Sequence, residues 1–220
     1  MDHFRPGIFA FLSELKENNT REWFQANKER YKSEVQEPLL GFISAFAEPL
    51  HAISANFVAD PRPSGGSMFR IYRDVRFSRD KSPYKVHAAA QFRHREGRDV
   101  HAPGFYLHLE PGSVFMGAGL WHPPGPTLGA IRQAIVDDPG GWRRASKGLV
   151  LGGESLKRAP RGFDPDHPLV NDLKRKDFVC MTESSQAAAC RSGFLDSFAD
   201  TCRASSPLVR FLTEAVGLEF

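Results

Sequence analysis

The sequence is poor in cysteine and in long apolar runs, and each shortage excludes a class of protein. Three cysteines among 220 residues are too few, and odd in number, for the disulfide framework of a small secreted domain. No apolar run reaches the length of about 18 residues that a membrane-spanning helix needs. The N-terminus has an acidic second residue and no cationic segment leading into a continuous apolar stretch, so it predicts no secretory signal. We therefore expect a cytoplasmic protein with reduced thiols and no membrane partner.

Spaced metal and cofactor motifs are also missing. There is no HExxH, no CxxC and no group of carboxylates at ligand spacing, and the eight histidines are scattered along the chain, so we expect no metal. The Gly117–Gly119 turn lacks the third glycine and the βαβ context of a dinucleotide site, and we expect no cofactor. Cys190 and Cys202 are spaced like buried positions of one amphipathic helix, and nothing around them predicts a reactive thiol.

What is present is the composition of an ordinary folded domain. Hydrophobic residues make up 41% of the chain and charged residues 25%, which is close to the average for globular proteins. A chain of this length can bury roughly 70% of the surface that its unfolded form exposes, so it needs no metal or disulfide to fold. No internal repeat or low-complexity linker divides it, and we expect one domain over residues 1–220.

The first third of the chain has helical periodicity. The apolar residues of a first helix form one stripe: Ile8, Phe11, Leu12 and Leu15. Thr20 is a suitable N-cap for a second helix, which we expect to end before Pro38. A third helix follows over residues 39–53, and Pro49 inside it predicts a kink or a restart.

Beyond this helical section the period changes from 3.6 to 2. Apolar and polar residues alternate over residues 68–73, 86–93, 105–110 and 113–116, a pattern typical of half-buried antiparallel strands. The Pro111–Gly112 pair makes a tight connection between the last two runs. We predict an α+β fold in which a central antiparallel meander packs its apolar face against the N-terminal and C-terminal helices.

After the meander the pattern returns mainly to helix. Apolar spacing predicts one helix after the His122–Pro126 stretch, one over residues 194–202 and a last one over residues 208–216. Residues 178–181 are a candidate for an added strand. These later helices complete the cover of the apolar sheet face in the predicted α+β fold.

Net charge is small overall but unevenly placed. Residues 68–98 contain nine cations and three anions, a net +6, so that the rest of the chain sums to −3. Clustered positive charge attracts anionic partners and can hold phosphate or carboxylate groups by charge-assisted hydrogen bonds. A solvated basic face is the other interpretation, and charge alone leaves the two equally open.

The strand alternation gives the meander a polar face opposite its apolar one. This face carries Arg70, Tyr72, His87, Gln91, Arg93, Tyr106, His108 and Glu110. Arginine suits bidentate contact with phosphate or carboxylate, and histidine is the side chain most easily poised near neutral pH. His87, His108 and Glu110 are therefore the candidates for proton transfer. A merely solvated sheet face, or a slip of one residue in register, is the alternative.

Within the basic region, residues 70–85 have the sequence RIYRDVRFSRDKSPYK and are here called the arginine box. The arginines recur every third position and cannot share one face of a strand, so we predict a strand through about Arg73 followed by an irregular loop. Asp74 and Asp80 are placed to pair with neighbouring guanidiniums. The loop is therefore either an anion-binding cradle, which we favour, or a salt-bridged brace. The residues expected to bind a ligand are Arg70, Tyr72, Arg73, Arg76, Lys81, Lys85 and Arg93.

The arginine box resembles the signature of a family of uncharacterised conserved hypothetical proteins, a domain of unknown function found in bacteria and some fungi. Further matches are Phe11–Phe24 (FLSELKENNTREWF), Gly117–Pro123 (GAGLWHP) and Leu156–Pro168 (LKRAPRGFDPDHP). The chain departs from the family at Ala118, where a run of glycines is expected. The resemblance implies one full-length domain, and it implies no activity, ligand or catalytic residue.

Three functions stay open at this point. The first is binding of a small phosphorylated or carboxylated compound through the arginine box, in an enzyme if His87 or His108 carries a proton. The second is nucleic-acid binding, because aromatic residues interleave with the basic ones, although the net charge of +3 is small for that role. The third is a scaffold or interaction protein whose basic segment only braces the fold. The first requires the guanidinium groups to converge on one recess; catalysis and oligomeric state stay undecided.

Overall fold

The structure is a computed structural model that describes residues 3–97 and 102–220. The helices are α1 (Pro6–Glu17), α2 (Arg21–Ala26), α3 (Lys28–Tyr31), α4 (Glu37–Ile53), α5 (Gly125–Asp137), α6 (Pro139–Ala145), α7 (Val170–Leu173), α8 (Gln186–Ala189) and α9 (Phe194–Ala215). A π-helical turn, η1 (Lys32–Gln36), joins α3 to α4. The strands are β1 (Phe57–Val58), β2 (Ala88–His94), β3 (Gly104–Glu110), β4 (Ser113–Leu120), β5 (Leu151–Gly152) and β6 (Phe178–Ser184).

The strands form one antiparallel sheet in the order β1-β2-β3-β4-β6-β5. The predicted meander is its centre, where β2 pairs with β3 and β3 with β4. Gly112, at φ +82°, lies in the tight turn between β3 and β4, a conformation that glycine adopts without strain. The candidate strand over residues 178–181 is confirmed as part of β6, which lies beside β4. The predicted α+β class is therefore confirmed.

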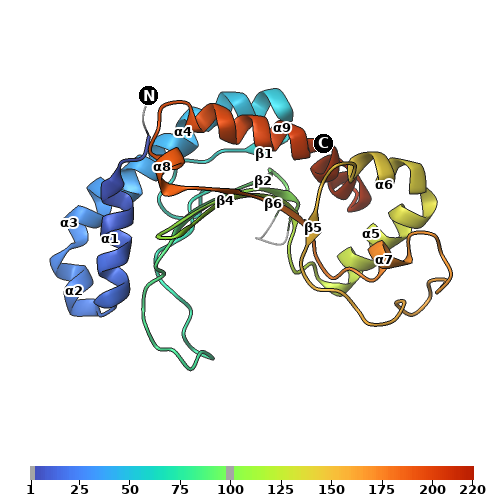
Figure 1. The fold of residues 1–220 in the computed structure, drawn as a ribbon, viewed down its shortest axis with the longest axis horizontal. Coiled ribbons are helices and arrows are strands. Elements are labelled where there is room, and N and C mark those ends of the chain that lie inside the picture. The colour runs from blue at the N-terminus through green and yellow to red at the C-terminus, as the bar shows by residue number, and fades with distance from the viewer. Residues whose placement is uncertain (1–2, 98–101) are drawn as a thin grey trace.

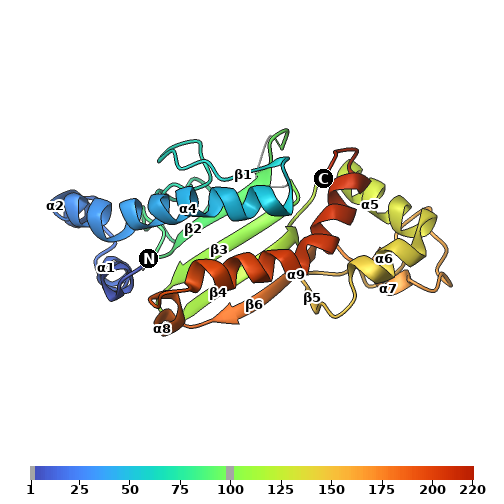
Figure 2. The same cartoon turned by 90° about the horizontal axis from the view of Figure 1, so that it is seen from above.

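Helices α4 and α9 lie across one face of the sheet (Figures 1 and 2). The Phe46 ring of α4 packs edge-on against Phe92 of β2 and Phe198 of α9, with ring centroids 4.7 and 4.8 Å away. All three rings are fully buried. The predicted packing of N-terminal and C-terminal helices on the apolar face is thus confirmed. Within the described residues no helix crosses the opposite face, which is flanked by α1–α3 at one end and α5–α7 at the other (Figure 1).

Prolines do not end the N-terminal helices where the sequence predicts. The end expected before Pro38 is wrong, because α3, η1 and α4 follow one another without a gap and Pro38 lies in the first turn of α4. The Glu37 N–H reaches back to the Lys32 carbonyl across the wider π turn, which makes room for the proline ring. Nor does Pro49 restart the helix, since α4 continues to Ile53.

The two helices predicted over residues 194–202 and 208–216 are a single helix, α9, which contains Pro207. Figure 2 shows that α9 bends along its length, as expected where a proline removes one donor from the hydrogen-bond ladder. Cys190 lies at the end of α8, so its predicted place on one helix with Cys202 is wrong. Burial raises the pKa of both thiols, which agrees with their expected lack of reactivity.

The predicted strand through Arg73 is not formed. Only two isolated bridges form in this part of the described chain: Met68, just before the box, pairs with Ala90 of β2, and Tyr72 pairs with Tyr84 inside the box. The aspartates of the box accept hydrogen bonds from their own local backbone, which competes with strand pairing. The box therefore leaves the sheet as a loop on the side opposite α4 and α9 (Figure 1), and the predicted irregular loop is confirmed.

Candidate functional site

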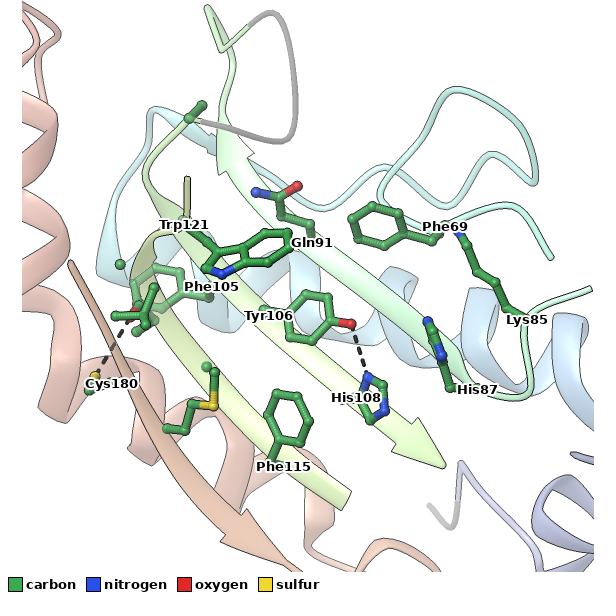
Figure 3. Close-up of a pocket in the computed structure, with 17 residues that line it drawn as sticks. Phe69, Lys85, His87, Gln91, Phe105, Tyr106, His108, Phe115, Trp121 and Cys180 are labelled. Carbon is green, nitrogen blue, oxygen red and sulfur yellow. Dashed lines mark hydrogen bonds between the residues drawn. The ribbon is translucent and has the colours of Figure 1, made fainter. Parts of the chain in front are cut away.

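The open face of the sheet carries a recess of about 480 Å³, shown in Figure 3. Its apolar lining includes Phe69, Phe115, Trp121, Val179 and Met181. Its polar groups are Lys85, His87, Gln91, Tyr106 and His108. A cavity of this volume, mostly apolar with a few polar groups, has the form of a binding site for a small organic molecule.

Two glycines of β4 form the floor of the recess. Gly117 pairs with Tyr106 of β3, and a Cβ on Gly117 would lie 3.5 Å from the Tyr106 Cβ, which is an ordinary contact. A Cβ on Gly119 would instead overlap the Phe178 carbonyl oxygen, and the φ of Gly119 is +121°. Gly119 is therefore required for the close approach of β6. Gly117 is not required in that way, and its missing side chain leaves space for a ligand.

Tyr106, His108 and Glu110 occupy every second position of β3 and so lie on the same side of the sheet. The Tyr106 hydroxyl is 3.0 Å from His108 Nδ1 (Figure 3), and His108 Nε2 is 3.0 Å from the Glu110 carboxylate. Because an ionised carboxylate only accepts, His108 Nε2–H donates to Glu110 and Nδ1 accepts from the Tyr106 hydroxyl. The Phe115 ring stacks on the His108 ring at 4.5 Å and 14°. The three side chains thus form a hydrogen-bonded relay.

His87 lies beside this relay. The register pairs Ala88 with Leu109, so position 87, one step further along, stands opposite Glu110. The His87 and His108 ring centroids are 4.5 Å apart. A ring nitrogen of His87, a ring nitrogen of His108 and a carboxylate oxygen of Glu110 all lie within 4.8 Å of one another. The structure therefore brings all three predicted proton-transfer candidates together at one end of the recess.

Burial shifts the pKa values of Tyr106 and His87 in the recess. It raises the pKa of Tyr106 to about 12, and the charge of Glu110 acts in the same direction. Burial also lowers the pKa of His87 to about 4, with smaller contributions from His108 and Lys85. At neutral pH the phenol is therefore protonated and the His87 imidazole is neutral.

Lys85 supplies positive charge at the recess. Its Nζ donates to the Arg70 carbonyl at 2.9 Å and lies 5.2 Å from the centre of the Phe69 ring. Burial lowers the pKa of Lys85, and Arg70 adds to the effect. Of the seven residues expected to bind a ligand, all of which the structure describes, only Lys85 lines this recess.

The arginine box does not converge on the recess, and the expectation that it would is wrong. Arg73 forms an ion pair with Asp80, and Arg76 forms one with Asp74 at 2.7 Å, so the predicted pairing of both aspartates is confirmed. The Lys81 ammonium donates to a backbone carbonyl of its own loop at 2.9 Å. These charges are bound within the loop that carries them.

The remaining members of the expected ligand-binding set lie elsewhere. Arg70 and Arg93 line a second, smaller recess of about 210 Å³, together with the turn formed by residues 64–69. Tyr72 is exposed and packs against Tyr84, with ring centroids 5.4 Å apart. The set is therefore divided between two recesses and an exposed loop.

One family profile covers most of the chain. It describes the conserved hypothetical proteins DUF2461 and matches residues 7–211. The chain belongs to this family. Neither the search of curated proteins nor the search of solved structures finds a match. Membership in DUF2461 brings no activity with it, so the function has to be argued from the recess.

In the described part of the chain, no helix has both the length and the apolarity to cross a membrane.

Sequence reasoning missed the aromatic wall of this recess in the DUF2461 chain. The alternation over residues 113–116 places Phe115 on the side opposite its apolar neighbours, and this was a usable signal. No local signal places Trp121. It lies beside His122, whose φ is +48° and whose N–H donates at 2.8 Å to Asp177, a carboxylate only 1% exposed. A bond to a residue distant in the chain therefore positions the turn that carries Trp121.

Proposed function

We propose that the protein binds, in the recess of about 480 Å³, a small organic molecule with a flat apolar body and one anionic group. The recess itself carries the proposal, because it combines apolar walls and a glycine floor with Lys85, His87 and His108 at one end. The ligand body lies against Phe69, Phe115 and Trp121. Its anionic group lies toward Lys85, the one cation of the arginine box that lines the recess.

The polar end of the recess is suited to proton transfer. A ligand group in reach of Tyr106 gives a proton to the phenolic oxygen while the phenolic proton passes to His108 Nδ1, and Glu110 stabilises the imidazolium that results. The return step restores the starting state. The reaction class that we assign to the site is therefore general acid–base catalysis on the bound molecule.

A matched pair of glycine substitutions tests the binding site. Gly117→Leu places a side chain in the recess, whereas Gly41→Leu makes the same change on α4, where nothing lies within 4 Å of an added Cβ. The probes are aryl carboxylates and aryl phosphates in a thermal-shift assay. A probe at 100 times its dissociation constant contributes about 2.7 kcal/mol to the stability of the protein that binds it. We expect this gain for the wild type and Gly41→Leu, and none for Gly117→Leu.

Two results would refute the proposal. One is an equal gain for Gly117→Leu, since the probe would then lie outside the recess. The other is the absence of a gain for the wild type across both probe classes. Glu110→Gln separates binding from chemistry: we expect probe affinity to be kept, and any turnover found with a responding compound to fall by at least about 100-fold.

Nucleic-acid binding is the second candidate, and one observation favours it. Phe77 is 95% exposed in the loop of the arginine box, and the Arg76 guanidinium carbon lies 5.9 Å from its ring centre. An exposed aromatic ring among cations is suited to stacking on a base. Under this candidate, binding of single-stranded RNA weakens steeply with salt and is lost in Phe77→Ala.

A further inference from the structure

We propose that His87, His108 and Glu110 bind one divalent transition-metal ion, Zn²⁺ or an ion of similar ligand preference, at the polar end of the recess. This goes beyond the proposed function, since binding of an organic anion beside Lys85 requires no metal. No spaced motif predicts the site. The ligands come from β3 and from the residue just before β2, and strand pairing brings them together.

The spacing of the ligand atoms fits such an ion. Two atoms bound at about 2.0–2.1 Å to one metal, at angles between 90° and 109°, lie about 2.9–3.4 Å apart. His108 Nε2 and the Glu110 carboxylate oxygen are already 3.0 Å apart. The full set, with His87, spans at most 4.8 Å. A rotation of the His87 side chain brings its ring nitrogen to bonding distance and closes the set.

The surroundings of His108 provide the second requirement of a metal site, a partner for the other ring nitrogen. With Nε2 on the metal, the His108 proton is on Nδ1, which donates to the Tyr106 hydroxyl oxygen at 3.0 Å; this arrangement fixes the tautomer of a metal-binding histidine. The metal-bound form therefore replaces the relay of the metal-free protein, in which His108 Nε2–H donates to Glu110 and Nδ1 accepts from Tyr106. The Phe115 ring, stacked at 4.5 Å, holds the plane of the imidazole. Tyr106 and Phe115 are therefore positioning residues for the proposed ligand His108.

The donor set selects the class of ion. Two imidazole nitrogens and one carboxylate oxygen suit Zn²⁺, Fe²⁺, Co²⁺ or Mn²⁺, whereas Ca²⁺ and Mg²⁺ prefer oxygen ligands throughout. Three protein ligands leave at least one coordination position for water or for a group of the bound molecule. Both histidines line the recess, so an open position would face the ligand, which is the form of a catalytic rather than a structural metal site.

Metal binding by untagged protein tests the proposal. The protein is stripped with a chelator, dialysed and titrated with Zn²⁺ in competition with a chromophoric chelator, and in parallel with Co²⁺ while its visible absorption is recorded. We expect one ion per chain, a rise in melting temperature, and a Co²⁺ spectrum of nitrogen and oxygen ligation. Removal of one ligand, in His87→Ala, His108→Ala or Glu110→Gln, should weaken binding by at least about 100-fold, and Tyr106→Phe by about 10-fold.

Matched controls keep the test specific. His51→Ala removes an exposed histidine of α4 and should leave the affinity unchanged. Glu110→Gln keeps the size of the side chain, and circular dichroism verifies that each variant folds. The proposal is overturned if the wild-type protein does not bind one Zn²⁺ per chain tightly. It is also overturned if the double variant His87→Ala, His108→Ala binds Zn²⁺ with the affinity of the wild type.

The proposed function and the metal site fail separately. Gly117→Leu should lose the aryl probes and keep the metal, because the added side chain enters the floor of the recess and removes no ligand. Chelator-treated wild type that binds the aryl probes but no Zn²⁺ refutes only the metal site. Protein that binds one Zn²⁺ but no aryl probe refutes only the proposed function.

Discussion

The arginine box and the recess adjoin in the chain and share Lys85, but their polar groups are used differently. In the box, Arg73 and Arg76 each pair with a carboxylate of the same loop, and solvent screening leaves such surface pairs little effect on stability. In the recess, His87 and His108 lie in ring contact, with Glu110 completing a group within 4.8 Å. The box is the more densely charged region, whereas the side chains that come together from separate strands are those of the recess.

This difference shows why charge density along a chain is a weak guide to a site. Oppositely charged residues that are close in sequence can pair inside one loop. Their charges then neutralise each other locally and are not directed toward a common ligand. Groups on two paired strands are held by the backbone ladder instead, and they meet whether or not they attract each other. Four predictions test whether changes in the recess and its supports affect stability and ligand binding more than changes in the exposed part of the box.

The largest effect is expected at the floor of the recess. Gly119→Ala should lower the free energy of unfolding by at least about 4 kcal/mol, because the new Cβ overlaps the Phe178 carbonyl and strains a positive φ. Gly117→Ala should stay within about 0.5 kcal/mol. Urea unfolding of both variants checks this, and equal stabilities would contradict the close approach of β4 and β6.

The next effect is expected where the arginine box joins the fold. Tyr84 is 2% exposed and stacks on Phe24 with ring centroids 4.1 Å apart. The Asn19 side chain accepts from the Tyr84 backbone N–H and donates to the Tyr84 carbonyl. Tyr84→Ala should cost about 3–4 kcal/mol of stability, as for other buried aromatic residues. Phe77→Ala, at the exposed part of the loop, should change stability by less than about 0.5 kcal/mol. A large loss in Phe77→Ala would mean that the loop is packed along its whole length.

A smaller effect is expected from pH. Burial lowers the pKa of His87 to about 4, below its ordinary value of 6.5, so the unfolded chain binds the proton more readily than the folded one. The stability that depends on neutral His87 is complete above pH 6.5 and is lost as the pH falls toward 4. With allowance for solvent screening, the loss is about 1–2 kcal/mol. Unfolding of chelator-treated protein between pH 7 and 4 measures it, and His87→Asn should flatten the slope; an unchanged slope would contradict the burial of His87.

The smallest effect is expected within the exposed part of the box. Arg76→Ala should leave both stability and probe affinity close to those of the wild type, because its ion pair with Asp74 is exposed and screened by solvent. Lys85→Met should weaken binding of an anionic aryl probe by about 10-fold, the loss of one charge-assisted contact. Isothermal titration of both variants gives the comparison. If Arg76→Ala weakened binding as much as Lys85→Met does, the box would have to be part of the binding site.

Much of the sheet was predictable, because strand alternation follows from backbone stereochemistry. The period of two over the central segments correctly predicted the meander and placed His87, Tyr106 and His108 on one face. It failed for Arg70 and Tyr72, since the start of the box forms one isolated bridge, Tyr72 with Tyr84, in place of a strand. Helix ends near proline were also misplaced, because a π turn and a bend let the chain pass residues that normally stop a helix.

Periodicity along the chain is enough to specify the strands of the meander, the helices that cover its apolar side and the polar residues on the other side. Each of these follows from neighbours a few residues apart. The depth of the recess follows from the pairing of β4 with β6, which Gly119 permits, and the meeting of His87 with Glu110 follows from the register of β2 on β3. Such contacts between distant segments depend on packing across the whole domain, and only the folded chain brings them about.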